Sequence, residues 1–191
     1  MTDERHLATL RAYWKTHQAF PSMAKLCAVL GLSSTSSVFA LIGRLCDAGF
    51  LERIDGRVAP TRNFFGRPLV GSIRAGPPEI QGQDLPELLT IDDYLVASPN
   101  RTVLCRVKGD SMRDAGMLDG DLVVVERGRP TRPGDIVVAA VDEDLTVKTL
   151  RLTKDGAFYL EPANPDYPAI HPRGSLEIIG VVIGLVRKYA A

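Results

Sequence analysis

Ser111 and Lys148 lie 37 residues apart in the sequence, and their residue types could act as a nucleophile and its base. Ser111 lies in Gly-Asp-Ser-Met, which is typical of a turn that exposes its hydroxyl group. A serine hydroxyl is a poor nucleophile without a base, and the three histidines of the chain are scattered. Lysine is the alternative base if burial lowers its pKa, by up to about 3–5 units. Leu150 and Leu152, on the same face of a predicted strand, favour that burial, although a capping serine and a surface lysine fit the spacing equally.

A candidate target for such a serine is the peptide bond between Ala75 and Gly76. Neither side chain shields the carbonyl group, so a nucleophile can approach it closely. The backbone amides of Ser111 and Met112 are candidate donors to the oxyanion that would form. An Ala-Gly dipeptide alone carries no weight, so its significance depends on the rest of the chain.

The second half of the chain predicts a mostly-β domain, over residues 81–191. Short apolar runs alternate with turn signals such as Asp119-Gly120 and Pro133-Gly134-Asp135. The predicted strands are Val103–Val107, Leu122–Val125, Ile136–Val141, Leu145–Leu152, Phe158–Leu160 and Ile178–Leu185.

The first 61 residues predict a separate helical domain. Apolar residues at helical spacing indicate helices from His6 to His17, from Ser22 to Leu30, and from Thr35 or Ser36 to just before Gly49. Ser22 suits an N-cap, and Gly31 suits the position after a helix. Two short helices joined by a glycine turn are typical of a helix-turn-helix.

A β-hairpin is predicted to follow the third helix, because Asp55-Gly56 favours a two-residue turn between Phe50–Ile54 and Arg57–Val58. Three helices and a hairpin form a winged helix, whose third helix would enter the major groove of DNA. A three-helix protein-binding module is the alternative. The candidate DNA contacts are Ser34, Thr35, Ser36, Ser37, Phe39, Arg44, Arg53 and Arg57. Phe39 fits a thymine methyl contact and core packing equally well.

Composition supports this division. The net charge is zero, but residues 1–75 hold ten basic and five acidic residues, so the first part is basic and the rest is acidic. Residues 62–80 lack clear periodicity and are predicted to be a linker that contains the candidate bond. No apolar run reaches the roughly 18–20 residues of a membrane span, and the polar start does not suit a signal peptide. Three distant cysteines fit a reducing cytoplasm, and no motif predicts a metal or cofactor.

These motifs together resemble the LexA/UmuD family of self-cleaving proteins of the SOS response, over nearly the whole chain. In the first part the resemblance rests on Phe20-Pro21-Ser22, Leu30-Gly31-Leu32-Ser33-Ser34 and Gly49-Phe50-Leu51. The ordered motifs of the second part are Ala75-Gly76, Gly109-Asp110-Ser111-Met112, Asp119-Gly120-Asp121-Leu122, Gly134-Asp135-Ile136-Val137 and Thr146-Val147-Lys148.

The resemblance implies an α+β protein with a winged helix-turn-helix and a mostly-β peptidase domain. It implies Ser111 as nucleophile, Lys148 as general base and Ala75–Gly76 as the bond that is cut within the same chain. It also implies a homodimer on double-stranded operator DNA, and a RecA–single-stranded DNA filament that stimulates cleavage. The expected function is repression of DNA-damage genes, relieved by self-cleavage.

Three features depart from that pattern. The segment Ile91-Asp92-Asp93-Tyr94-Leu95-Val96 resembles the branch that serves translesion polymerases, so a polymerase accessory subunit is an alternative. Pro77 removes an amide donor directly after the candidate bond. The third helix is rich in serine, so its operator sequence need not be the usual one. A phage-type repressor and a DNA-binding dimer with a silent peptidase are further alternatives.

Overall fold

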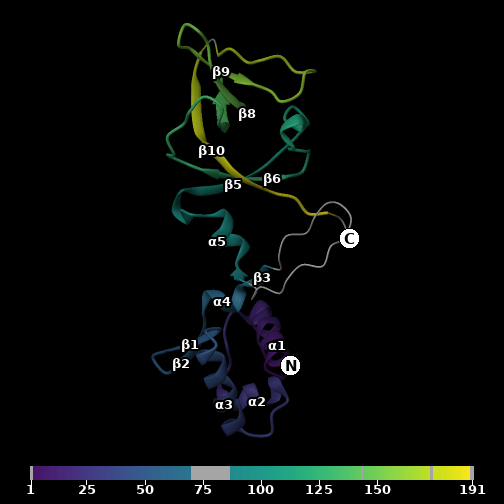
Figure 1. Cartoon of the computed structure of the whole chain (residues 1–191), viewed down its shortest axis with the longest axis vertical. Coiled ribbons are helices and arrows are strands. Elements are labelled where there is room, and N and C mark those ends of the chain that lie inside the picture. The colour runs from purple at the N-terminus through teal and green to yellow at the C-terminus, as the bar shows by residue number, and fades with distance from the viewer. Residues whose placement is uncertain (1, 70–86, 143, 173, 190–191) are drawn as a thin grey trace. The chain divides into compact units, whose positions relative to one another are not determined.

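The computed structural model describes residues 2–69, 87–142, 144–172 and 174–189. The chain forms two compact units, Met1–Tyr94 and Leu95–Ala191 (Figure 1). The first unit contains the long helices, and the second contains a large antiparallel sheet. The predicted α+β class is therefore confirmed.

Helix α1 (Thr2–His17) begins four residues before the predicted start at His6. Its first turn contains Asp3 and Glu4, and its last turn contains Lys15 and His17. These charges lie where they complement the helix dipole, with acids at the start and bases at the end. The prediction was too short because apolar periodicity begins only at Leu7, and a polar first turn does not contribute to that pattern.

Helices α2 (Met23–Leu30) and α3 (Thr35–Asp47) have the predicted limits to within a residue or two. The Ser22 hydroxyl accepts a hydrogen bond from the Lys25 amide, and the Ser34 hydroxyl accepts one from the Ser37 amide. Gly31 ends α2 at φ 65°, a conformation that glycine adopts without strain. Local capping chemistry therefore sets both helices and the short turn between them.

The hairpin of β1 (Leu51–Ile54) and β2 (Arg57–Pro60) is also confirmed. Asp55 and Gly56 both have positive φ, at 50° and 74°. That combination is the primed turn, whose twist matches the flanking strands.

The helices and the hairpin pack around one apolar core. Its buried side chains are Leu7, Leu10, Leu26, Leu30, Val38, Leu41, Ile42, Leu45, Leu51 and Phe64. They come from all three long helices, from β1 and from the segment after the hairpin, so each element depends on the others. Within the described residues no single helix has the length and hydropathy to cross a membrane, whereas α2 and α3 meet those criteria as a pair bent by 86°.

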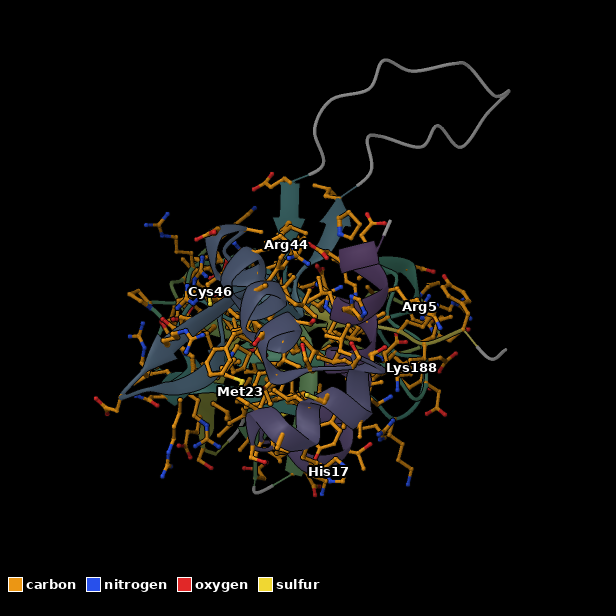
Figure 2. The ribbon with its side chains drawn as sticks, turned by 90° about the horizontal axis from the view of Figure 1, so that it is seen from below. Arg5, His17, Met23, Arg44, Cys46 and Lys188 are labelled. Atoms are coloured by element: carbon orange, nitrogen blue, oxygen red, sulfur yellow. The ribbon has the colours of Figure 1, made fainter. Side chains whose placement is uncertain are left out.

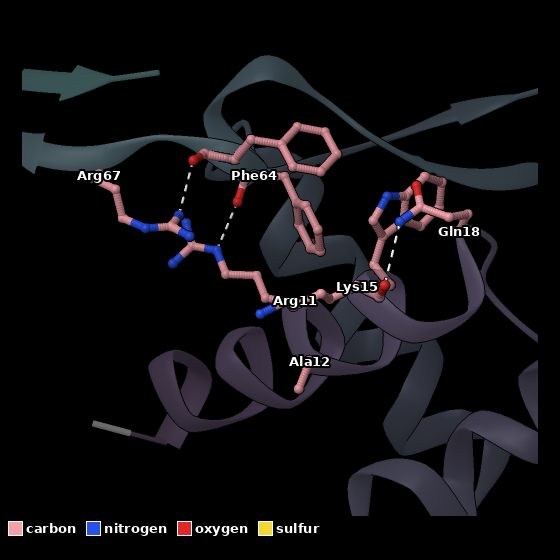
Figure 3. Close-up of a pocket in the computed structure, with 8 residues that line it drawn as sticks. Arg11, Ala12, Lys15, Gln18, Phe64 and Arg67 are labelled. Carbon is pink, nitrogen blue, oxygen red and sulfur yellow. Dashed lines mark hydrogen bonds between the residues drawn. The ribbon is translucent and has the colours of Figure 1, made fainter. Parts of the chain in front are cut away.

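Residues 62–69 are not the irregular linker that the sequence predicts. They form a short helix, α4 (Arg62–Phe65), and a strand, β3 (Arg67–Leu69), which pairs with β4 (Glu87–Leu89). The Phe64 side chain enters the core, and the Arg11 Nε of α1 donates a 2.6 Å hydrogen bond to the Phe64 carbonyl (Figure 3). The bond to Arg11 spans 53 residues of the sequence, and Phe64 also packs against Trp14 and Phe20, so local periodicity could not reveal these contacts.

The second unit begins at the end of α5 (Ile91–Leu95) and includes η1 (Pro99–Arg101). Its six strands match all six predicted runs to within two residues at each end. They are β5 (Thr102–Arg106), β6 (Leu122–Glu126), β7 (Ile136–Val141), β8 (Asp144–Leu152), β9 (Phe158–Glu161) and β10 (Leu176–Val186).

The order of strands in this sheet is β5-β6-β10-β7-β8-β9, and every pairing is antiparallel. The long strand β10 pairs with β6 at one end and with β7 at the other, and its register shifts just before Gly180 and just before Gly184. A Cβ at Gly180 would lie 2.6 Å from the Glu126 carbonyl oxygen, so only glycine fits there. Such irregularities bend a strand and increase its twist.

We expect Phe64→Ala to destabilise the first unit by roughly 3–5 kcal/mol, the usual cost of emptying a buried aromatic site. The adjacent Phe65→Ala is a matched control, because the Phe65 side chain is 46% exposed and should cost about 1 kcal/mol or less. Urea unfolding followed by the fluorescence of Trp14, the single tryptophan, measures both. Equal small losses would show that α4 does not belong to this core.

Candidate functional site

Ser111 lies in the predicted turn, between β5 and the short helix η2 (Arg113–Ala115). Gly109 has φ 84°, and its amide donates to the Asp119 carboxylate at 2.7 Å. The Arg113 amide donates to the Asp110 carbonyl at 3.0 Å and closes the turn around Ser111. Backbone geometry therefore presents this hydroxyl group outside any strand.

The structure brings Lys148 to Ser111. The Lys148 Nζ, on β8, donates a hydrogen bond to the Ser111 Oγ at 2.8 Å. Strands β5 and β8 are separated by three other strands in the hydrogen-bonded order, so the sheet must curl to join their ends. The bulged strand β10 at its centre provides a physical reason for that curvature.

Two further oxygen atoms surround the lysine amine. Lys148 Nζ donates to the Thr146 Oγ1 at 2.9 Å and to the Val147 carbonyl at 3.0 Å. In the sequence Thr146 belongs to the motif Thr146-Val147-Lys148, but no role is predicted for its hydroxyl group. The available signal was its position two residues before Lys148, since alternate residues of a strand share a face.

Lys148 is buried as predicted, with 6% of its surface exposed, but only one of the two leucines expected to bury it is itself buried. Leu150 is buried as expected, but Leu152 is 47% exposed near the end of its strand. Burial lowers the pKa of Lys148, because removing the amine from water disfavours its charged form. Among the described residues no carboxylate forms an ion pair with it.

A cleft of about 380 Å³ opens beside this pair of residues. Its walls come from both ends of the curled sheet and from the segment before the turn. Ser111 and Lys148 line it together with the apolar residues Val107, Val123, Val138 and Leu145. Arg106, Lys108 and Thr146 line it as well, so the cleft has both apolar and polar walls and suits a short peptide segment.

The remaining predicted site residues have different outcomes. Met112 is buried, and in the described part of the chain neither its amide nor that of Ser111 donates a hydrogen bond. Both donors are therefore unengaged by the protein itself. The predicted bond between Ala75 and Gly76, and Pro77 after it, lie outside the described residues.

An ion pair secures the segment that follows the turn. Arg187, directly after β10, donates to both carboxylate oxygens of Asp121 at 2.7 and 2.6 Å and to the Gly116 carbonyl at 2.7 Å. The Leu118 amide also donates to Asp121. The guanidinium group and then this amide lower the pKa of Asp121 to about 2, so the pair stays charged at neutral pH.

The candidate DNA contacts of the first unit lie on one helix and one hairpin. Ser34 to Ser37 are exposed in the first turn of α3, although the Ser34 hydroxyl is occupied as the N-cap. Phe39 is 48% exposed, which excludes core packing within this unit, and the Arg53 guanidinium lies 5.5 Å from the centre of its ring.

The two other predicted arginines differ in their environment. Arg57 is exposed at the start of β2. Arg44, on α3 (Figure 2), uses two N–H groups to bind the Asp3 carboxylate at 2.8 and 2.9 Å. Its charge is therefore already compensated within the unit. The two residues are 41 positions apart, so the sequence alone did not predict this ion pair.

A family model described as Peptidase S24-like matches residues 68–183, which include the turn, the lysine strand and the cleft. The chain belongs to this family. The sequence of this chain is also 38% identical to that of the LexA repressor of Azoarcus sp. (strain BH72), over 87% of this chain and 84% of that protein. It is 36% identical to LexA repressor 1 of Nocardia farcinica, over 96% and 91%, and 38% identical to the LexA repressor of Opitutus terrae, over 88% and 87%.

The similarity to these relatives extends over both units of the chain. The likeness therefore covers the helical first unit as well as the region matched by the family model. The resemblance to the LexA/UmuD family is confirmed at this level, and with it membership of a family of self-cleaving serine peptidases.

We expect Lys148→Met to raise the free energy of unfolding at neutral pH. The folded state lowers the pKa of Lys148, so between that value and 10.5 the unfolded chain binds more protons, and wild-type stability rises with pH. Methionine removes the cost of burying the charge, and its advantage should shrink as the pH approaches 10.5. Urea unfolding at pH 7 and pH 10, followed by circular dichroism, measures this difference.

The exposed Lys154→Met is the matched control, and its effect should stay within about 0.5 kcal/mol at both pH values. A loss of stability in Lys148→Met at pH 7, with no dependence on pH, would contradict the assigned cost of burial.

Proposed function

We propose that this chain is a LexA-type repressor of DNA-damage genes that inactivates itself by cutting the bond between Ala75 and Gly76. The observation that carries this proposal is the contact of 2.8 Å between a buried lysine amine and a serine hydroxyl at the wall of a cleft. The LexA repressors to which the chain is similar, by their names, support the regulatory part.

The chemistry begins with a neutral Lys148. A neutral amine has two N–H groups and one lone pair. The Thr146 hydroxyl and the Val147 carbonyl accept the two hydrogens, which leaves the lone pair for the Ser111 proton. Ser111 Oγ then attacks the Ala75 carbonyl carbon, and Lys148 takes the proton.

The resulting tetrahedral intermediate collapses when Lys148 returns that proton to the Gly76 nitrogen. The C–N bond breaks, an ester joins Ala75 to Ser111, and water hydrolyses the ester with Lys148 again as base. The amides of Ser111 and Met112 are the proposed donors to the negative oxygen, because neither is otherwise engaged within the described residues.

The first unit is proposed to be a winged helix-turn-helix that binds double-stranded operator DNA. Exposed hydroxyl groups in the first turn of α3, the exposed Phe39, and Arg53 and Arg57 on the hairpin form the proposed surface. Arg44 is a weaker candidate for a phosphate contact, because it would first have to leave Asp3. The basic charge of residues 1–75 supports attraction to phosphate groups.

Cleavage would act as the switch by separating residues 1–75, which contain the proposed DNA-binding surface, from the second unit, through which the homodimer is proposed to form. Two joined units bind two half-sites with an avidity that separated units lose. A RecA–single-stranded DNA filament is the proposed stimulus for cutting. The alternative of a polymerase accessory subunit gains no support, since the relatives named above are LexA repressors.

Incubation of the purified protein at raised pH should give two fragments whose masses correspond to a cut between Ala75 and Gly76. The rate should rise with pH as Lys148 loses its proton, and level off below about pH 10.5 because burial lowers that pKa. Ser111→Ala and Lys148→Ala should abolish cutting, whereas the exposed Lys154→Ala should cut at the wild-type rate. Intact mass spectrometry over time measures all four proteins.

A wild-type protein that remains intact both at raised pH and with RecA filaments would exclude the self-cleaving function. Cutting that persists in Lys148→Ala with an unchanged pH profile would instead reject the lysine as base and leave the serine in place.

The affinity of the intact protein for duplex DNA should fall steeply as salt is raised, because phosphate contacts release counterions. Arg57→Ala should weaken binding and reduce the slope of log affinity against log salt by about 1. Arg151→Ala, which removes an arginine of the second unit that pairs with Glu161, is the control and should leave the slope unchanged. Fluorescence anisotropy of a labelled duplex measures this, and a flat salt response would contradict the assigned surface.

A further inference from the structure

A second loop forms hydrogen bonds to the turn that contains Ser111. This clamp loop, residues 162–167, directly follows β9 and is 54 residues from the turn in sequence. Asn164 is 97% buried, and its Nδ2 donates to the Asp110 carbonyl oxygen at 3.1 Å and to the Asp110 carboxylate at 3.3 Å. The Tyr167 hydroxyl donates to the other oxygen of that carboxylate at 2.6 Å.

The rest of the clamp loop supports the same contact. The Asp114 amide donates to the Ala163 carbonyl at 2.8 Å, and the Arg113 guanidinium lies 3.4 Å from the Asp166 carboxylate. The Asn164 Oδ1 accepts the Asp166 amide at 3.0 Å, which fixes the direction in which its Nδ2 points. The side-chain amide of Asn164 is thus fully oriented from both of its ends.

The bond from Asn164 controls a particular peptide plane. The Asp110 carbonyl and the Ser111 amide belong to the same planar trans peptide unit, in which C=O and N–H point in opposite directions. Holding the carbonyl oxygen against Asn164 therefore directs the Ser111 amide away from the clamp loop. That amide is one of the two proposed oxyanion donors.

We propose that Asn164 and Tyr167 are positioning residues, which act through Asp110 to fix the Ser111 amide and hydroxyl against Lys148. This inference rests on the proposed self-cleavage. Neither residue touches the reacting atoms, and neither changes the surroundings of the Lys148 amine. They set how often the serine is in the reactive geometry, and they leave the protonation of the base unaltered.

The decisive measurement is the pH profile of cleavage in Tyr167→Phe and Asn164→Leu. The first removes one hydroxyl from an exposed residue, and the second replaces an amide donor by an apolar group of similar size, so neither adds a charge that could move the pKa of Lys148. We expect the limiting rate at high pH to fall about five- to tenfold and on the order of a hundredfold, respectively. The pH of half-maximal rate should not move in either variant. Tyr159→Phe, in the same unit and without a hydrogen bond from its hydroxyl among the described residues, should match the wild type.

A purely structural role gives a different result. If the clamp loop only held the unit together, its loss would admit water to Lys148, restore its pKa toward 10.5 and shift the whole profile to higher pH. Such a shift, or an unchanged limiting rate in Tyr167→Phe, would overturn the proposal. In an Asp110→Ala background, Tyr167→Phe should have no further effect, because both act through the same carboxylate.

Hydrogen exchange keeps the inference separate from the proposed function. The Asp114 amide, which donates to Ala163, should exchange at least about tenfold faster in Asn164→Leu than in the wild type. If the wild type never cuts itself, the proposed function fails, but exchange still reports whether the clamp loop orders the turn. Unchanged exchange at Asp114 would overturn the clamp, even in a protein that cleaves itself normally.

Discussion

The chemistry of the second unit depends on the free-energy cost of burying the charged amine of Lys148 away from water. No carboxylate among the described residues pairs with Lys148, so its charged form lacks the compensation that buried cations normally have. Its three hydrogen-bond partners are two hydroxyl groups and a carbonyl, which a neutral amine satisfies as well as an ammonium group. The environment therefore favours the form of lysine that can accept a proton.

That environment requires the fold to bring distant strands together. The amine enters from β8 and the serine from the end of β5, at positions that a flat sheet would hold three strands apart. Curvature through β10 closes this gap, and the same strand then delivers Arg187 to Asp121. The turn is thus anchored beyond Met112 by an ion pair and before Ser111 by the clamp loop, so both of its ends are fixed while the serine stays accessible.

The sequence predicted those elements that local chemistry decides. The caps at Ser22 and Ser34, the Asp55-Gly56 turn and the six strands all depend on residues within a few positions of each other. It missed α4, because the burial of Phe64 depends on α1, and it missed the support from Asn164, because that bond spans 54 residues. Residue chemistry alone proposed the pairing of Ser111 with Lys148, but their spacing also fits two unrelated surface residues, and the resemblance decided between these interpretations.

The pairing of β3 with β4 bears on how a cut would release the two parts. Ala75 and Gly76 lie between these strands in sequence, so a cut there leaves β3 on one fragment and β4 on the other while they remain hydrogen-bonded. The pairing spans only three residues on each side, from Arg67 opposite Leu89 to Leu69 opposite Glu87. A two-stranded sheet of this size is marginal in water once the chain that joins its strands is broken. The fragments would then separate without unfolding the core around Phe64, so a single cut bond would suffice to release residues 1–75 from the rest of the chain.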